Sequence, residues 1–290
     1  MSGRWLGALR RWWRHRAVGA DEYSEEEGIP NALWLCTTGL YPFIAELPAE
    51  GVRRLRALSS RFLSQKEFHG AQGLEVTDAM AVAIAAQACL PLLHWGPAAQ
   101  ALRWYDDFVG IVVHPGQVVA RREVTDEAGV VHGYDEVLAG EAMDRGPVML
   151  SWQDVQEAAS ATAQGYNVVI HEFAHKLDMR DGAPDGCPPL PAGFLGTRGG
   201  PAARRAWMAV LEPAWEGFRE QVIIAERFSG EAPWLDAYAA ESPAEFFAVA
   251  CEGYFVNRAR FAAEFPALLA LFDAFFRPAA AAAAAARSAR

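Results

Sequence analysis

The residues best suited to chemistry are two histidines and a glutamate in the segment His171-Glu172-Phe173-Ala174-His175. On an α-helix, residues four apart lie on one face, so the imidazoles of His171 and His175 can bind one metal ion together. Glu172 then lies beside the ion without binding it. From there its carboxylate can take a proton from a water that the ion acidifies to a pKa of about 7. This spacing is typical of zinc hydrolases, and it predicts one Zn²⁺ per chain with Glu172 as the general base.

Three fixed residues in a window of five also occur by accident, and two buried histidines can simply be hydrogen-bonded core residues. The neighbouring residues favour the metal site, because apolar side chains surround the charged ones, as in a buried helix with one polar face. These apolar neighbours are Val168, Val169, Ile170, Phe173, Ala174 and Leu177. Buried histidines and a buried glutamate need partners, and a metal ion supplies one.

A catalytic zinc ion usually has three protein ligands and one water. No histidine follows His175, so a third ligand in the C-terminal part must be a carboxylate or a thiol. Glu245 is the best candidate, because Ser242 and Pro243 before it form a helix-start signal. A carboxylate in a first helical turn also suits the helix dipole without any metal. The alternatives left open are Glu241, Cys251 and Glu252.

The helix that carries the motif is predicted over residues 168–179, with Asn167 as its N-cap. A strand is predicted shortly before it, over residues 146–152. As an edge strand beside a zinc cleft it could hold an extended peptide by main-chain hydrogen bonds, and the alternative is a plain structural strand. Residues 180–193 are rich in Gly and Pro and predict a loop, either at the rim of the site or as a connector.

The hydrophobic periodicity of the rest of the chain predicts an α+β fold, mostly helical with a small mixed sheet beside the helix that carries the motif. The other predicted elements are helices at 45–68, 81–92 (started by Thr77), 202–227 and 242–276, and strands at 108–113, 118–121 and 130–134. We expect a flexible leader, basic and then acidic, over residues 1–30. One domain should span 31–277, and 278–290 is a low-complexity alanine-rich tail.

Composition narrows the class of protein. The formal net charge is -10 and the pI is near 5.2, which argues against direct nucleic-acid binding, because phosphate contacts need a basic face. The four cysteines are too scattered for a disulfide scaffold. No run is long and apolar enough for a transmembrane segment, and the N-terminus lacks the apolar core of a signal peptide, so a cytoplasmic enzyme is expected. Its Arg/Trp-rich leader could lie on a membrane surface or an acidic partner, although a frayed tail is favoured.

Several segments together resemble one protein family. They are Asn167 to Asp178, Asp236 to Val249, Leu58 to Phe68, Gly73 to Met80, Ile84 to Cys89 and Trp104-Tyr105. In these the chain is similar to the Mlc titration factor A family of zinc-dependent bacterial peptidases, which are gluzincin-like, over about residues 40–275. The leader, the loop after Arg180 and the alanine tail depart from the family.

The resemblance implies a zincin-like metallopeptidase fold with an N-terminal helical part. It implies that His171, His175 and Glu245 bind zinc and that Glu172 is the general base. It also implies that Tyr238 lies near the metal, where its hydroxyl could donate to the oxyanion formed when water adds to a peptide carbonyl. Asp178 and Glu252 are then candidates for orienting the ligand imidazoles.

The function implied is that of an aminopeptidase acting on short peptides. The alternative is a regulatory protein that binds and sequesters a Mlc-like transcription repressor, with peptidase activity secondary. The peptide substrate, its residue preference and the existence of such a partner are not readable from the sequence.

Overall fold

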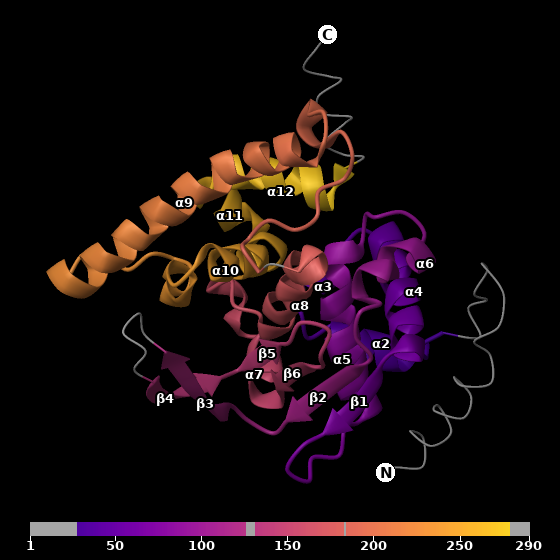
Figure 1. Cartoon of the computed structure of the whole chain (residues 1–290). Coiled ribbons are helices and arrows are strands. Elements are labelled where there is room, and N and C mark those ends of the chain that lie inside the picture. Colours follow the sequence, from indigo (N-terminus) through magenta and orange to yellow (C-terminus); the bar gives the residue numbers. More distant parts are fainter. Residues whose placement is uncertain (1–27, 126–130, 183, 279–290) are drawn as a thin grey trace.

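The computed structural model describes residues 28–125, 131–182 and 184–278, with the backbone alone for residues 118–125 and 131–138. It is mostly helical with a small mixed sheet, which confirms the predicted α+β class (Figure 1). The helices are α2 (Asn31–Thr38), α3 (Pro42–Ala45), α4 (Ala49–Gln65), α5 (Asp78–Cys89), α6 (Ala98–Ala101), α7 (Trp152–Glu157), α8 (Val168–Asp178), α9 (Gly200–Phe228), α10 (Pro243–Val256), α11 (Arg258–Glu264) and α12 (Pro266–Phe276).

The sheet has the strand order β1-β2-β6-β5. Its strands are β1 (Glu67–Gly70), β2 (Gly110–His114), β5 (Gly140–Ala142) and β6 (Val148–Ser151). The first three strands in that order are parallel neighbours, and β5 runs antiparallel to β6 at the edge. A separate antiparallel pair, β3 (Val118–Thr125) and β4 (Val131–Leu138), leads from β2 to β5. The short edge strand β5 therefore comes directly after the β3-β4 hairpin.

Helix α8 begins as predicted, because the Asn167 side chain accepts a hydrogen bond from the Ile170 amide at 2.9 Å. Figure 1 shows α8 in the middle of the molecule, between α5 and α10 and above the sheet. Most of its residues are buried, including Phe173, whose ring packs edge-on against Tyr105 at 4.9 Å between centroids. The helix that carries the motif is thus fixed by core packing on several sides.

Lys176 anchors the far side of α8. Its side chain is fully buried, and its ammonium donates to the carbonyl oxygens of Met143 at 2.6 Å and Gly146 at 3.1 Å. Asp107 supplies a carboxylate at 3.3 Å. These bonds hold the chain between β5 and β6 against α8, because a buried ammonium must keep its acceptors.

One predicted strand has a different place in the sheet from the one expected. The predicted edge strand at 146–152 corresponds to β6, which lies between β2 and β5, so the edge is the unpredicted strand β5. The helical stretch predicted over 242–276 consists of α10, α11 and α12. The first break is at Asn257, whose side chain caps α11. The second is at Phe265, whose backbone angles of φ -129° and ψ 61° are not helical, and a residue before proline avoids the helical conformation.

The predicted helix at 45–68 ends earlier, at Gln65, and the next residues form β1. Helix 81–92 is confirmed as α5, which is capped by Thr77 and buried along nearly its whole length. The predicted leader and alanine tail lie almost wholly outside the described residues. Within the described ranges, no helix combines the length and apolar character that a bilayer crossing needs.

Candidate metal centre

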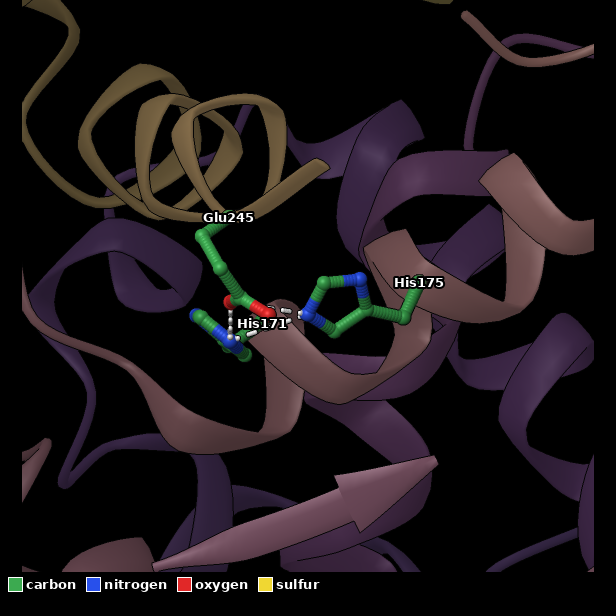
Figure 2. Close-up of side chains that lie close together, drawn as sticks. All are labelled: His171, His175 and Glu245. Atoms are coloured by element: carbon green, nitrogen blue, oxygen red, sulfur yellow. Dashed lines mark hydrogen bonds and ion pairs between the residues drawn. The ribbon is translucent and has the colours of Figure 1, made fainter. Parts of the chain in front are cut away.

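Three side chains from two helices meet at one point, as Figure 2 shows. Glu245 Oε2 lies 3.2 Å from His171 Nε2 and 3.1 Å from His175 Nε2, and the two imidazole nitrogens are 3.2 Å apart. Helix α8 supplies both histidines, and α10 supplies the glutamate from its first turn. Ser242 fixes that turn, because its hydroxyl accepts a hydrogen bond from the Glu245 amide at 3.1 Å.

The donor set fits a zinc ion. Ligand atoms about 2.0–2.1 Å from a tetrahedral ion lie roughly 3.3 Å from one another, close to the spacing of these three atoms. Two imidazoles and one carboxylate are also a known donor set for catalytic zinc. Among the described residues, this is the one cluster of histidine, cysteine or acidic side chains arranged to hold an ion. The alternatives Glu241, Cys251 and Glu252 are not in it.

The electrostatics of the cluster suit a cation. Burial raises the pKa of Glu245, but hydrogen bonds from the two imidazoles outweigh it and hold that pKa well below its usual range. Burial lowers the pKa of His175, which favours the neutral form that binds metals. Burial also lowers the pKa of His171, but hydrogen bonds to Glu245 and Glu252 raise that pKa by more. A metal ion bound to the imidazole would replace the proton that these two carboxylates favour.

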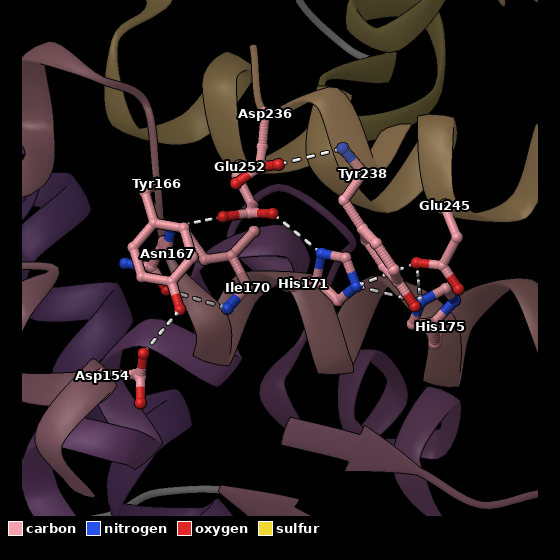
Figure 3. Close-up of polar contacts among 10 residues, drawn as sticks. All are labelled: Asp154, Tyr166, Asn167, Ile170, His171, His175, Asp236, Tyr238, Glu245 and Glu252. Atoms are coloured by element: carbon pink, nitrogen blue, oxygen red, sulfur yellow. Dashed lines mark hydrogen bonds and ion pairs between the residues drawn. The ribbon is translucent and has the colours of Figure 1, made fainter. Parts of the chain in front are cut away.

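Glu252 positions the first ligand imidazole. Its Oε1 lies 2.8 Å from His171 Nδ1, so it can accept the proton there and leave Nε2 for a metal (Figure 3). Its other oxygen accepts a hydrogen bond from the Asn167 amide. The Asn167 side chain in turn donates to Gln87 on α5 at 2.7 Å. A buried polar chain therefore runs from the core of the molecule to His171.

We expect Glu252→Gln to lower zinc affinity about 10- to 100-fold, because the amide accepts the imidazole proton less strongly and holds the ring less firmly. Zinc affinity is measured by competition with a chromophoric chelator, and folding by circular dichroism. The matched control is Asp178→Asn, which changes the buried carboxyl of the last residue of α8 and should keep its zinc affinity. A Glu252→Gln protein that is folded and binds zinc as tightly as the unmodified chain would contradict this role.

Asp178 does not take the position predicted for it. Its Oδ2 accepts a hydrogen bond from the Gly186 amide at 2.7 Å, and among the described residues it forms no hydrogen bond or ion pair with His171 or His175. Burial raises its pKa to about 8. The side chain therefore fastens the loop that follows α8. The prediction was wrong because Asp178 is the last residue of α8 and is directed toward the loop.

Glu172, the predicted general base, is buried in the wall of the cleft that holds the metal cluster. The pKa of its carboxyl is raised to about 8, chiefly by burial. The charge of His171 opposes this rise, and the nearby carboxylates of Glu245 and Glu252 add to it. A carboxyl with a pKa near neutrality can both accept and return a proton, as a general base and acid must.

Gly140 on β5 makes room for that carboxyl. A Cβ at this position would lie 2.4 Å from Glu172 Oε1 and 2.6 Å from its Cγ, closer than atoms can approach. The sequence held no signal for this residue, because the contact joins a three-residue strand to a helix that follows many residues later.

We expect Gly140→Ala to lower kcat by at least about 10-fold, because the methyl group displaces the Glu172 carboxylate and small misplacements of catalytic groups are costly. Zinc content should not change, since no candidate ligand is touched. The control is Gly110→Ala in the same sheet, where a Cβ meets only Pro147 at 3.4 Å. Unchanged kcat in a folded Gly140→Ala protein would show that this glycine does not place Glu172.

Tyr238 also lies at the cluster, as predicted. Its ring centroid is 6.1 Å from that of His171, and Figure 3 shows its side chain extending toward the ligand group. About a third of the residue, 36%, is exposed, so it faces the cleft more openly than Glu172 does. The cleft has a volume of about 690 Å³ and reaches from β5 to the start of α10.

The chain is similar to known proteins over most of its length. A family model described as glucose-regulated metallo-peptidase M90 matches residues 9–277. A protein named Mlc titration factor A from Salmonella arizonae is 36% identical over 258 residues, which cover 88% of this chain and 95% of that protein. One of the same name from Salmonella gallinarum is 37% identical over 238 residues, covering 81% and 82%.

The family match extends beyond the predicted range of 40–275. It begins at residue 9, so most of the leader, expected to depart from the family, falls inside it. The match covers the three clustered donors, Glu172 and Tyr238. The chain therefore belongs to the M90 family of glucose-regulated metallopeptidases and is a relative of the Mlc titration factor A proteins.

Proposed function

We propose that this chain is a zinc-dependent peptidase of the zincin-like, gluzincin kind, acting on short peptides as an aminopeptidase does. The observation that carries the proposal is the convergence of His171, His175 and Glu245 beside a buried Glu172. Zinc in such a site would acidify water and polarise the scissile carbonyl. Family membership supports the class of reaction.

The chain's own residues would carry the proton steps. Glu172 would take a proton from the attacking water and deliver it to the leaving amine. Glu252 would hold the imidazole of His171 with Nε2 toward the metal. Tyr238 would donate a hydrogen bond to the carbonyl oxygen as negative charge develops on it.

Strand β5 is suited to hold the substrate main chain. It lies at the end of the sheet order, pairs with β6 on one side, and contributes Gly140, Glu141 and Ala142 to the cleft wall. An extended peptide could add to its other side by main-chain hydrogen bonds, as peptides do at exposed sheet edges. In this proposal β5, and not residues 146–152, is the edge strand that holds the peptide.

The test is hydrolysis of chromogenic aminoacyl substrates by the zinc-loaded chain, before and after zinc is removed with a chelator. Hydrolysis should disappear with the metal and return when zinc is added back. Hydrolysis that persists in the chelated, zinc-free protein would contradict the proposal.

We expect Tyr238→Phe to lower kcat about 100-fold, the order of loss seen when one oxyanion donor is removed, with KM changed little. The steady-state constants kcat and KM are measured with zinc content confirmed to be unchanged. Tyr166→Phe is the control, because it also removes a tyrosine hydroxyl from this cleft. That hydroxyl donates to Asp154 and does not lie at the ligand group, so kcat should change little. A Tyr238→Phe enzyme with full kcat would remove the tyrosine from the mechanism.

A second candidate function is regulatory. The relatives are named Mlc titration factor A, and the name favours binding of a Mlc-like repressor. Both functions can exist in one chain. Binding of a purified repressor of that kind by the zinc-loaded protein, measured by calorimetry, tests the second one independently of hydrolysis.

A further inference from the structure

Gln87 is an isolated amide in the apolar helix α5. The other buried residues of α5 are alanine, valine, isoleucine, methionine and cysteine, and Gln87 itself is fully buried. It is not one of the residues that line the cleft of the metal cluster. A buried amide is costly unless its hydrogen bonds are made, so an apolar side chain would serve better if packing were the only requirement. The amide therefore points to a specific interaction.

Both ends of the Gln87 amide have a partner. Its Nε2 donates to the carbonyl oxygen of Ala83 at 3.0 Å, and its Oε1 accepts from Asn167 Nδ2 at 2.7 Å. Turning the amide over would place oxygen against oxygen at Ala83 and NH2 against NH2 at Asn167. The bond to Ala83 therefore fixes Oε1 as the atom of Gln87 that faces Asn167.

The side chain of Asn167 is fixed in the same way. Its Oδ1 accepts from the Ile170 amide at 2.9 Å, which leaves Nδ2 to donate to Gln87. Asn167 is also fully buried, so neither end of its amide can turn to solvent instead. Its backbone N–H donates to Glu252 Oε2. Gln87 thus holds the residue that both caps α8 and bonds to Glu252.

The remaining links lead to the metal cluster. Figure 3 shows the contacts from Asn167 to Glu252 and from Glu252 to His171. A carboxylate can only accept, so the His171 imidazole donates from Nδ1 and its Nε2 is left for a metal. A displacement of Asn167 would displace the Glu252 carboxylate, and with it the imidazole.

We propose that Gln87 is a positioning residue of the metal centre. It acts from outside the cleft, through Asn167 and Glu252, on the orientation of the His171 imidazole. The inference rests on the metal binding in the proposed function, and it adds a residue from the N-terminal helices to the set that determines zinc affinity.

The first test is zinc affinity, measured by competition with a chromophoric chelator. Gln87→Met keeps the length of the side chain but removes the amide that accepts from Asn167. Affinity should fall about 10-fold, the lower end of the range for residues that orient a ligand. The matched control is Tyr105→Phe, which removes a buried hydrogen bond to another α5 carbonyl, that of Ala88, at 3.0 Å and should keep its zinc affinity. Full affinity in a folded Gln87→Met chain, or an equal loss in Tyr105→Phe, overturns the proposal.

The second test asks whether Gln87 acts through Glu252. Residues that belong to one hydrogen-bond network have effects that do not add. The double variant of Gln87→Met and Glu252→Gln should therefore bind zinc about as weakly as Glu252→Gln alone. Fold-losses that multiply in the double variant would show that Gln87 acts by another route, and they overturn the proposal.

A further variant decides the question if Gln87→Met does not fold. Asn167→Ser keeps an oxygen that can cap α8 and the backbone N–H that bonds to Glu252, but it has no NH2 group to donate to Gln87. Its zinc affinity should also fall about 10-fold. Unchanged zinc affinity in Asn167→Ser overturns the proposal.

Proton NMR of the chain with ¹⁵N-labelled histidine separates this inference from the proposed function. The Nδ1 proton of His171, bonded to Glu252, should give a downfield resonance in both the metal-free and the zinc-loaded chain. Gln87→Met should shift this resonance, and Tyr105→Phe should leave it in place. Such a shift supports the positioning role even if the chain hydrolyses nothing and the proposed function fails. An unshifted resonance in folded Gln87→Met overturns the role even if the chain is an active peptidase.

Discussion

Glu172→Gln is expected to lower kcat on chromogenic aminoacyl substrates by about 10²- to 10⁴-fold, the range that a general base contributes. The amide has nearly the same shape as the carboxyl but cannot take a proton. Zinc content should stay at one ion per chain, because Glu172 does not belong to the donor cluster. The measurement pairs initial rates with zinc determined on the same sample.

The matched control is Glu157→Gln, a carboxylate in the wall of the same cleft that is not among the clustered donors. It should keep kcat within about 3-fold, as substitutions away from the reacting atoms usually do. Glu172→Gln also separates the two candidate functions, since binding of a Mlc-like repressor should survive it. Hydrolysis at the unmodified rate by Glu172→Gln would show that the proton steps proposed here are wrong.

Glu245→Ala is expected to release the zinc ion. Mutation of a residue that only orients a ligand typically lowers metal affinity about 10- to 100-fold, and loss of the ligand itself should lower it by more. The variant should therefore hold almost no zinc after dialysis. Activity should be lost with the metal. Zinc per chain is measured by atomic absorption. Folding is checked by circular dichroism, because the substitution removes the carboxylate that both imidazoles contact.

The control for this variant is Glu241→Ala, four residues earlier in the same segment and outside the cluster. It should retain its zinc. If Glu245→Ala retained a full ion and Glu241→Ala lost it, the third ligand would be Glu241, one of the three alternatives that the sequence left open.

The site was more predictable from the sequence than the rest of the fold. His171 and His175 follow from helical spacing, and Asn167 and Ser242 are capping residues whose effect is local. Each signal lies within a few residues of the feature it determines. Local signals do not bring Glu245 to the histidines, because the two helices are far apart along the chain. The family resemblance implies that contact, and the structure brings the three donors together.

Features that depend on distant contacts were missed or misplaced. Asp178 and Glu252 were equal candidates for orienting an imidazole, and only the crossing of α8 and α10 brings Glu252, and not Asp178, to His171. Strand β5 has three residues and no periodicity to detect, so its place at the sheet edge was not visible. The break before Pro266 is different, because it has a local signal: the residue before a proline avoids the helical conformation.

The most direct test of the central claim is the position of the metal, from anomalous diffraction at the zinc edge on crystals of the zinc-loaded chain. One peak is expected, about 2.0–2.2 Å from His171 Nε2, His175 Nε2 and a carboxylate oxygen of Glu245. Glu172 should lie beside it without coordinating. A peak coordinated by other residues, or no peak at this cluster in zinc-loaded protein, would contradict the account.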